Sequence, residues 1–129
     1  MLGVAAKQVL GSAEDLLVLV EDEEAVLQAR PDFTALTTLA WRGIIITAPG
    51  RRSDFVSRFF GPAVGVAEDP VTGSAHCVLT PYWSAILNKK ELYARQVSRR
   101  GGELWCRQAG ERVHIRGRAA LYLQGVITV

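Results

Sequence analysis

One short stretch of this 129-residue chain gathers the side chains that could carry out chemistry. In the stretch 69–74, a carboxylate (Asp69) precedes Thr72 by three residues, and Gly73 and Ser74 follow at once. The run 75–87 is mostly apolar and predicts a buried helix. A carboxylate beside the start of such a helix can act as a general acid or base if a ligand removes it from water. The alternative is a surface acid that only complements the positive end of the helix.

The start of this helix is a candidate anion site. Thr72 is predicted to be the N-cap residue, so that Gly73, Ser74 and Ala75 form the first turn. The backbone N–H groups of a first turn have no partner within the helix and suit a carboxylate or phosphate. Gly73 would let a ligand approach the backbone, and Ser74 would add a hydroxyl donor. The same residues are equally consistent with a simple helix cap.

The histidines and cysteines predict little further chemistry. His76 and Cys77 are expected to pack in the core, because a histidine on an apolar helix is usually a hydrogen-bonded core residue. Cys106 and His114 lie on different predicted strands, and one residue of each kind does not make a metal site. Free thiols in a reducing cytoplasm are the expectation for the two cysteines.

Length and composition indicate one globular domain, 1–129. The chain is 49% hydrophobic and 22% charged, with a net charge of +2. This balance argues against a nucleic-acid partner, although several arginines gather between positions 95 and 118. No apolar run approaches the roughly 20 residues that cross a membrane, and we expect no membrane partner.

The hydrophobic pattern predicts an α+β domain. Apolar or β-branched runs predict strands at 15–20, 43–48 and 54–60, and short-looped segments predict four more, at 92–99, 102–108, 112–117 and 120–129. Helices are expected at 22–29, 32–39 and 73–87, with a kink or break at Pro81. Residues 2–11 are expected to form a connector or short helix. A helix that is apolar all round must be covered, so a strongly curved, barrel-like mixed sheet should wrap around one central helix.

Three tracts resemble the PhzF-like family of phenazine biosynthesis. They are Glu68-Asp69-Pro70-Val71-Thr72-Gly73-Ser74-Ala75-His76, the segment 96–104 (QVSRRGGEL) and the segment 54–60 (DFVSRFF). Together they cover essentially the whole chain but resemble only the second half of a family member. The family is similar in fold to diaminopimelate epimerase, with two related domains and a site in the cleft between them.

The resemblance implies an isomerase that needs no metal or organic cofactor and moves a proton within a small carboxylated substrate. It implies a catalytic role for Asp69 and substrate binding by Thr72, Gly73 and Ser74. In the related epimerase a cysteine stands where Asp69 stands, so a cysteine-based epimerase is not expected.

The family's principal catalytic glutamate belongs to the first domain, and its Asn-Pro and Gly-His pairs do not occur in this chain. We therefore expect the equivalent of a C-terminal domain that is incomplete without a first-domain partner. The alternative is a non-catalytic module that forms a homodimer and binds ligands or other proteins.

Overall fold

The structure, a computed structural model, describes residues 1–128. Eight strands form one mixed sheet in the order β1-β2-β3-β4-β6-β7-β8, and β5 pairs with β4 beside this path. The strands are β1 (Gln8–Gly11), β2 (Asp15–Leu19), β3 (Gly43–Pro49), β4 (Phe55–Gly61), β5 (Val66–Asp69), β6 (Glu91–Gln96), β7 (Gly102–Ala109) and β8 (Arg112–Arg116). The helices are α1 (Glu23–Gln28), α2 (Phe33–Leu36), the 3-10 turn η1 (Pro62–Val64) and α3 (Gly73–Leu87).

Two crossover connections give the sheet its mixed character. Strands β2 and β3 are parallel because α1 and α2 carry the chain back between them, and β4 and β6 are parallel because β5 and α3 do the same. The remaining pairs are antiparallel. Parallel neighbours need a long connection of this kind, whereas antiparallel neighbours can be joined by a tight turn. Strand β4 therefore touches β3, β5 and β6 and lies at the centre of the domain.

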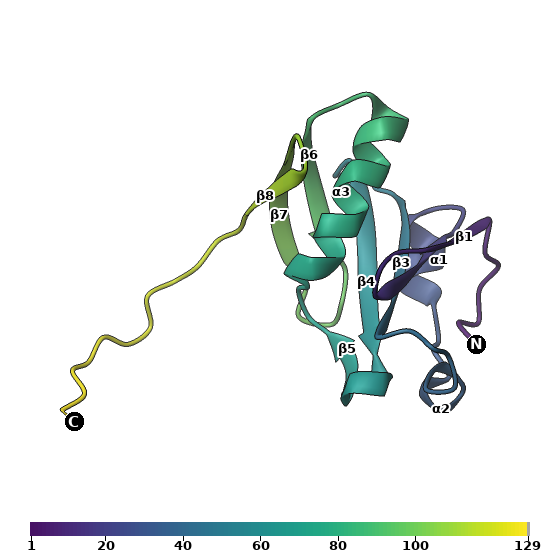
Figure 1. Ribbon diagram of the computed structural model, residues 1–129, viewed down its shortest axis with the longest axis horizontal. Helices are drawn as coiled ribbons and strands as arrows, with labels where there is room; N and C mark the ends of the chain where they lie inside the picture. Colours follow the sequence, from purple (N-terminus) through teal and green to yellow (C-terminus); the bar gives the residue numbers. More distant parts are fainter. Residues whose placement is uncertain (129) are drawn as a thin grey trace.

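The sheet carries a separate apolar cluster on each face. Helix α3 covers one face, where Leu79 and Trp83 pack against Ile45 and Phe55. Helices α1 and α2 cover the other face, with residues such as Val26 buried. Figure 1 shows α3 in front of the strands and α1 behind them. Trp83 stacks on Phe55 at 5.7 Å between ring centroids, and its indole N–H donates to Thr47 Oγ1 at 3.1 Å.

Several expectations from the sequence are confirmed. The helices expected at 22–29 and 32–39 are present as α1 and the shorter α2. Asp22 and Asp32 cap them, and their carboxylates accept backbone hydrogen bonds of 2.9 and 3.0 Å from Ala25 and Ala35. The long apolar helix is present and runs unbroken through Pro81, so of the two expected outcomes, a kink or a break, the break is wrong. Proline is tolerated in the first turn of a helix, where the backbone N–H has no partner within the helix. Pro81 lies beyond that turn, so α3 lacks one hydrogen bond there, and packing against the sheet outweighs this loss.

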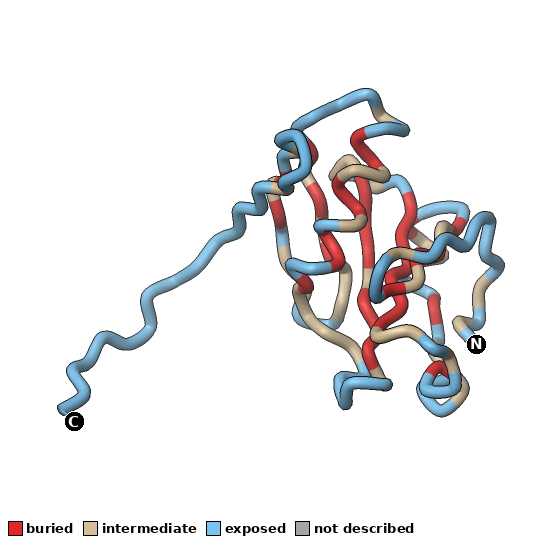
Figure 2. The backbone as a smooth tube through the Cα atoms, in the orientation of Figure 1, coloured by how far each residue is buried: buried red, intermediate tan, exposed pale blue. Residues whose placement is uncertain are grey.

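The sheet does not close around α3. Cys77 and Ile86 on that helix are exposed, Ile86 by 54%, so the helix is covered on one side only. Strand β1 replaces the expected connector or helix at 2–11, and β5 was not predicted. The expected strand at 120–129 is absent across 120–128, which form an extended tail whose residues are exposed along its length (Figures 1 and 2). Residue 129 lies outside the described residues.

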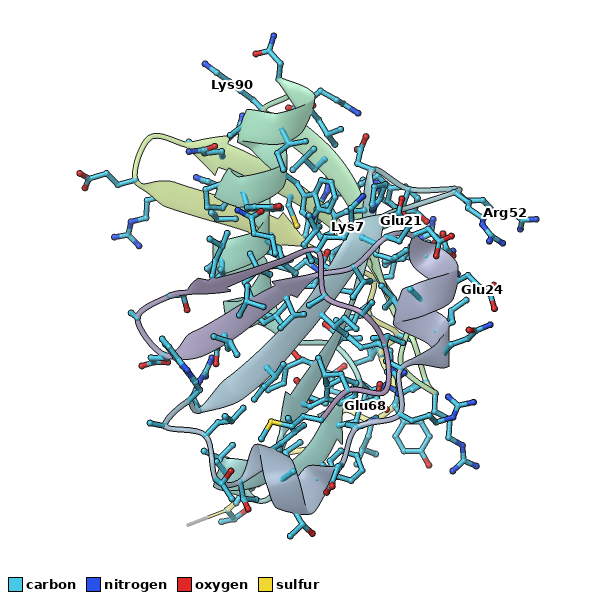
Figure 3. All side chains as sticks on the ribbon, turned by 90° about the vertical axis from the view of Figure 1, so that its right-hand side faces the viewer. Lys7, Glu21, Glu24, Arg52, Glu68 and Lys90 are labelled. Atoms are coloured by element: carbon cyan, nitrogen blue, oxygen red, sulfur yellow. The ribbon has the colours of Figure 1, made fainter. Side chains whose placement is uncertain are left out.

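Charged pairs fasten the margins of the domain. Lys7 and Glu21, labelled together in Figure 3, pair at 2.7 Å and join the approach to β1 with the end of β2. Both side chains are at least half exposed, so we assign this pair little stability. Arg58 is more buried; it pairs with Glu68 at 2.7 Å and donates to the carbonyls of Val26 and Ala29 at the end of α1. This arginine therefore links β4, β5 and α1.

Candidate functional site

The segment Asp69–Thr72 connects the end of β5 to the start of α3. Strand β5 pairs with β4 through Phe59 and Asp69, with a register shift between Phe59 and Gly61. The pairing places Asp69 beside the central strand just before the chain turns into the helix. The three tracts singled out in the sequence thus meet here. Strand β3 pairs along one edge of β4, and β5 and β6 share the other edge, β6 at 55–57 and β5 at 59–61.

Gln96 holds this segment from the end of β6. Its side chain is 1% exposed. Its Oε1 accepts a hydrogen bond of 2.8 Å from the backbone N–H of Thr72, and its Nε2 donates to the carbonyl of Asp69 at 2.7 Å. The same Nε2 also donates to Thr72 Oγ1 at 3.0 Å. One buried amide thus satisfies backbone groups on both sides of the turn, as buried polar groups require.

The turn between β6 and β7 supports the segment from a second direction. Ser98 Oγ donates to the carbonyl of Pro70 at 2.8 Å and accepts from the N–H of Gly101 at 3.0 Å. Gly102 packs directly under Val71, since a Cβ built on Gly102 would lie 2.3 Å from Val71 Cγ2. A side chain at position 102 would clash with Val71, so glycine is favoured there. Gly101 has a positive φ of 72°, which also favours glycine.

Thr72 occupies the N-cap position, but its hydroxyl does not cap the helix. Its backbone is extended, and no side-chain capping hydrogen bond is formed. The hydroxyl donates instead to Asp69 Oδ2 at 2.5 Å. Thr72 is 7% exposed, so its side chain faces Asp69 and Gln96 rather than solvent. The prediction that Thr72 is the N-cap residue is thus confirmed, but its hydroxyl oxygen accepts from Gln96 Nε2 instead of from a backbone N–H of the first turn.

Gly73 and Ser74 are exposed at the first turn of α3. A Cβ at Gly73 would meet no atom within 4 Å, so the space beside this backbone is open. Arg42, which the sequence did not single out, donates from Nη2 to Ser74 Oγ at 3.1 Å. Its guanidinium forms two hydrogen bonds, of 3.0 and 2.5 Å, with the buried carboxylate of Asp15. The hydrogen bond to Asp15 also raises the pKa of Arg42, which remains a cation beside the helix end.

His76 is a core residue, as predicted. Its Nδ1 lies 2.8 Å from the carbonyl of Thr72, which can only accept, so Nδ1 carries the proton. Burial lowers the pKa of His76 and keeps its imidazole neutral. Cys77 is exposed, so its predicted place in the core is wrong, whereas Cys106 is buried and burial raises the pKa of its thiol. Both cysteines are free thiols.

The candidate residues lie on an open surface. A hollow of about 950 Å³ borders the segment at Val71, Gln96 and Gly102. A second hollow has a volume of about 320 Å³ and is lined by Glu68, Pro70, Ser98, Arg99 and Arg100. Asp69, Gly73 and Ser74 are not among its lining residues. Across residues 1–128, no three His, Cys, Asp or Glu side chains are grouped so that they could hold a metal ion. Over the same range, every helix is too short or too polar to cross a membrane.

Gln96 and Arg42 contact the candidate site but were not identified from the sequence. Only Gln96 departs from a sequence pattern in a way that could have indicated it. Gln96 follows Leu92 and Ala94 at the inward positions of β6, so it is a polar residue where alternation predicts an apolar one. Arg42 lies beside Asp15 because β2 and β3 are adjacent and parallel, and no local pattern predicts its contact with Ser74.

Comparison with known families places the chain. The model of the phenazine biosynthesis-like protein family (PhzC-PhzF) matches residues 3–125. The chain belongs to this family. An uncharacterized isomerase of Pseudomonas aeruginosa is 63% identical over 126 residues, which are 98% of this chain and 48% of that protein. A human phenazine biosynthesis-like domain-containing protein is 53% identical over 94 residues, which are 67% of this chain and 33% of that protein.

Solved structures agree with this assignment. A crystal structure of a phenazine biosynthesis PhzC/PhzF protein from Clostridium difficile is 44% identical, with a TM-score of 0.89 over 98% of this chain and 49% of that one. A PhzF-family structure from Enterococcus faecalis is 42% identical, with a TM-score of 0.84 over 93% and 49%. The chain therefore spans about half the length of the relatives that it matches most fully.

Proposed function

We propose that this chain forms one wall of the active site of an isomerase that moves a proton within a small carboxylated metabolite. In this proposal, Asp69 exchanges the proton, and the first turn of α3 binds the substrate carboxylate through Gly73 and Ser74. The observation that carries it is the half-buried carboxylate of Asp69, held next to an exposed helix start. The name of the Pseudomonas aeruginosa relative, an isomerase, supports the reaction class.

Charge at the helix start favours a carboxylate ligand. The N–H groups at the first turn of a helix can donate hydrogen bonds to an anion, and the helix dipole adds positive potential there. The guanidinium of Arg42 lies beside Ser74 and adds a full positive charge. A substrate carboxylate bound at this end would bring its neighbouring carbon atoms close to Asp69, three residues before the cap. A carboxylate base working on such a carbon needs no cofactor in principle.

The site proposed here is incomplete within this chain. Asp69, Gly73 and Ser74 open on a surface, whereas proton transfer from carbon is most efficient where water is excluded. We propose that a first domain, corresponding to the remaining half of the relatives, covers this surface and supplies the second acid or base. In the same proposal, the complete protein closes a barrel-like sheet around α3. It acts in the cytoplasm.

Binding of a simple carboxylate tests the proposal directly. Benzoate added to the isotopically labelled chain should shift the backbone amide resonances of Gly73 and Ser74 in a saturable way, and neutral benzamide of the same shape should not. Gly73→Val, which fills the open space beside the backbone, should weaken benzoate binding at least tenfold. If these amides do not move at millimolar benzoate, the substrate-binding role is wrong.

A non-catalytic homodimeric module is the second candidate, and the exposed tail favours it. Tyr122 and Val126 are 98% and 95% exposed, and neighbouring apolar side chains are similarly uncovered. Apolar surface of this kind invites association with another protein or with a second copy. Sedimentation equilibrium separates the candidates, because a chain that stays monomeric at high micromolar concentration contradicts the homodimer.

A further inference from the structure

The hydrogen-bond directions around Thr72 can be assigned without ambiguity. The backbone N–H of Thr72 can only donate, so the atom of Gln96 that faces it at 2.8 Å must be the amide oxygen. The carbonyl of Asp69 can only accept, so the amide nitrogen of Gln96 must face it at 2.7 Å. The two backbone contacts thus fix the orientation of this side-chain amide from opposite ends, which a single contact would leave to assumption.

This orientation also fixes the hydroxyl proton of Thr72. The nitrogen of Gln96 is 3.0 Å from Thr72 Oγ1 and donates to it. The hydroxyl's own proton must therefore point elsewhere, and Asp69 Oδ2 accepts it at 2.5 Å. The donors follow one direction, from Gln96 through Thr72 to Asp69.

Every polar group of Thr72 has a partner within the protein. Its N–H donates to Gln96, its hydroxyl accepts from Gln96 and donates to Asp69, and its carbonyl accepts from His76 Nδ1. The hydroxyl proton of Thr72 is already donated to Asp69, so it is not available to a ligand. Thr72 is also only 7% exposed, so a ligand has little access to it. This engagement suits a residue that positions another group rather than one that binds a substrate.

We infer that Gln96 and Thr72 are positioning residues that hold Asp69 as a proton acceptor with a defined orientation. The inference rests on the function proposed above for Asp69. Because Oδ2 already accepts the hydrogen bond of Thr72, it is the less basic oxygen, and the proton exchange with a substrate is assigned to Oδ1. The carboxylate accepts one proton on Oδ1 and later returns it, so the step needs no oxidant or co-reactant. Thr72 is thereby moved from the predicted substrate-binding set to the support of the catalytic carboxylate.

Two substitutions of Thr72 separate positioning from packing. Thr72→Ser keeps the hydroxyl and removes a methyl group, whereas Thr72→Val keeps the shape and removes the hydroxyl. If Thr72 only fills space, the valine variant should preserve the site better than the serine variant. If it positions Asp69, the order is reversed.

The readout is the side-chain rotamer of Asp69, measured in the ligand-free 129-residue chain by three-bond couplings to its Cβ protons and carboxyl carbon. The wild-type protein and Thr72→Ser should show a single Asp69 rotamer. Thr72→Val should show couplings averaged over two or more rotamers, while its amide spectrum elsewhere remains that of the folded domain. A single wild-type-like rotamer in Thr72→Val would overturn the inference, as would averaging in Thr72→Ser with retention in Thr72→Val.

This measurement is independent of the benzoate titration. A wild-type chain that ignores benzoate contradicts the proposed function, even if the rotamers follow the expected order. If the wild-type protein binds benzoate but Thr72→Val keeps a single Asp69 rotamer, the proposed function stands and the positioning role of Thr72 is contradicted.

Discussion

Two irregular segments of this protein differ in what surrounds them. The segment 69–72 leaves β5 and the tail 117–128 leaves β8, and both lack regular structure for most of their length. The first is fixed by hydrogen bonds from Gln96 and Ser98 and is buried at Thr72. The second carries large apolar side chains, such as Leu121 and Tyr122, that are 84% and 98% exposed. Figure 2 shows the tail exposed throughout, well away from the buried strands.

The comparison shows that composition alone does not decide where a segment becomes ordered. The segment 69–72 contains proline and polar residues, yet it is ordered by hydrogen bonds to Gln96 and Ser98. These bonds stabilise the fold because a backbone N–H or carbonyl group buried without a partner would destabilise it. The tail has the composition of a buried strand, yet no strand edge or apolar face of the described residues covers it. Order at the site comes from specific polar contacts, and order in the tail requires a surface that residues 1–128 do not supply.

Gln96→Leu should produce the largest loss of stability. The substitution leaves the N–H of Thr72 and the carbonyl of Asp69 without their buried partner, so we expect a loss of about 2–4 kcal/mol in the free energy of unfolding. Urea denaturation followed by tryptophan fluorescence measures this loss. Gln28→Leu, at an exposed position of α1, is the control and should change stability by no more than about 0.5 kcal/mol. Equal effects of the two substitutions would show that the amide of Gln96 does not hold the segment.

Gly102→Ala tests the second support of the segment. The new Cβ would lie 2.3 Å from Val71 Cγ2, so the chain must shift, at an expected cost of about 1–3 kcal/mol. Adding Val71→Ala should recover part of the loss, because it removes the atom in conflict. Gly73→Ala, whose Cβ meets nothing within 4 Å, is the matched control and should be close to neutral. Additive losses in the double variant would mean that the 71–102 contact is not the cause.

His76 adds a pH-dependent element to the same segment. Burial lowers the pKa of His76 below its ordinary value of 6.5, so the unfolded chain binds a proton more readily than the folded chain. The stabilisation is therefore complete above about pH 6.5 and is lost as the pH falls below it, by at most about 1.4 kcal/mol per pH unit. The difference in unfolding free energy between wild type and His76→Phe should be constant above pH 7 and should shrink below pH 6. A constant difference over the whole range would show that His76 does not titrate on unfolding.

The sequence predicted the parts of the fold whose pattern is local. Strands β2 and β3 are continuous apolar runs, and Asp22 and Asp32 are typical caps, so these elements follow from propensity and periodicity. Strands β1 and β5 have four residues each, and β1 is exposed throughout, so neither shows an apolar pattern. Each is a strand because a partner offers its hydrogen-bonding edge, and such pairing is a property of the tertiary structure.

The candidate site was predictable in composition but not in its contacts. Asp69 and the exposed pair Gly73 and Ser74 stand where their spacing from the helix start predicts. The donor to the Thr72 hydroxyl could not be predicted, because the oxygen of an N-cap threonine can accept either from a backbone N–H of the first turn or from a side chain. Gln96 decides between them from 24 residues away along the chain, and sequence spacing carries no information about that approach.

Removal of the tail should have the smallest effect on stability and the clearest effect on association. A chain ending at Arg118 keeps the contacts of that arginine with Trp105 and Glu103, so its unfolding free energy should lie within about 0.5 kcal/mol of that of the full chain. Any self-association through Leu121, Tyr122 and their neighbours should disappear, and sedimentation would then report a monomer. A matched variant, Tyr122→Glu with Val126→Lys, keeps the length of the tail and should weaken self-association, because it replaces the two most exposed large apolar side chains of the tail with charged ones. If truncation instead costs several kcal/mol, the tail packs on its own domain in solution, and the contrast between the two segments does not hold.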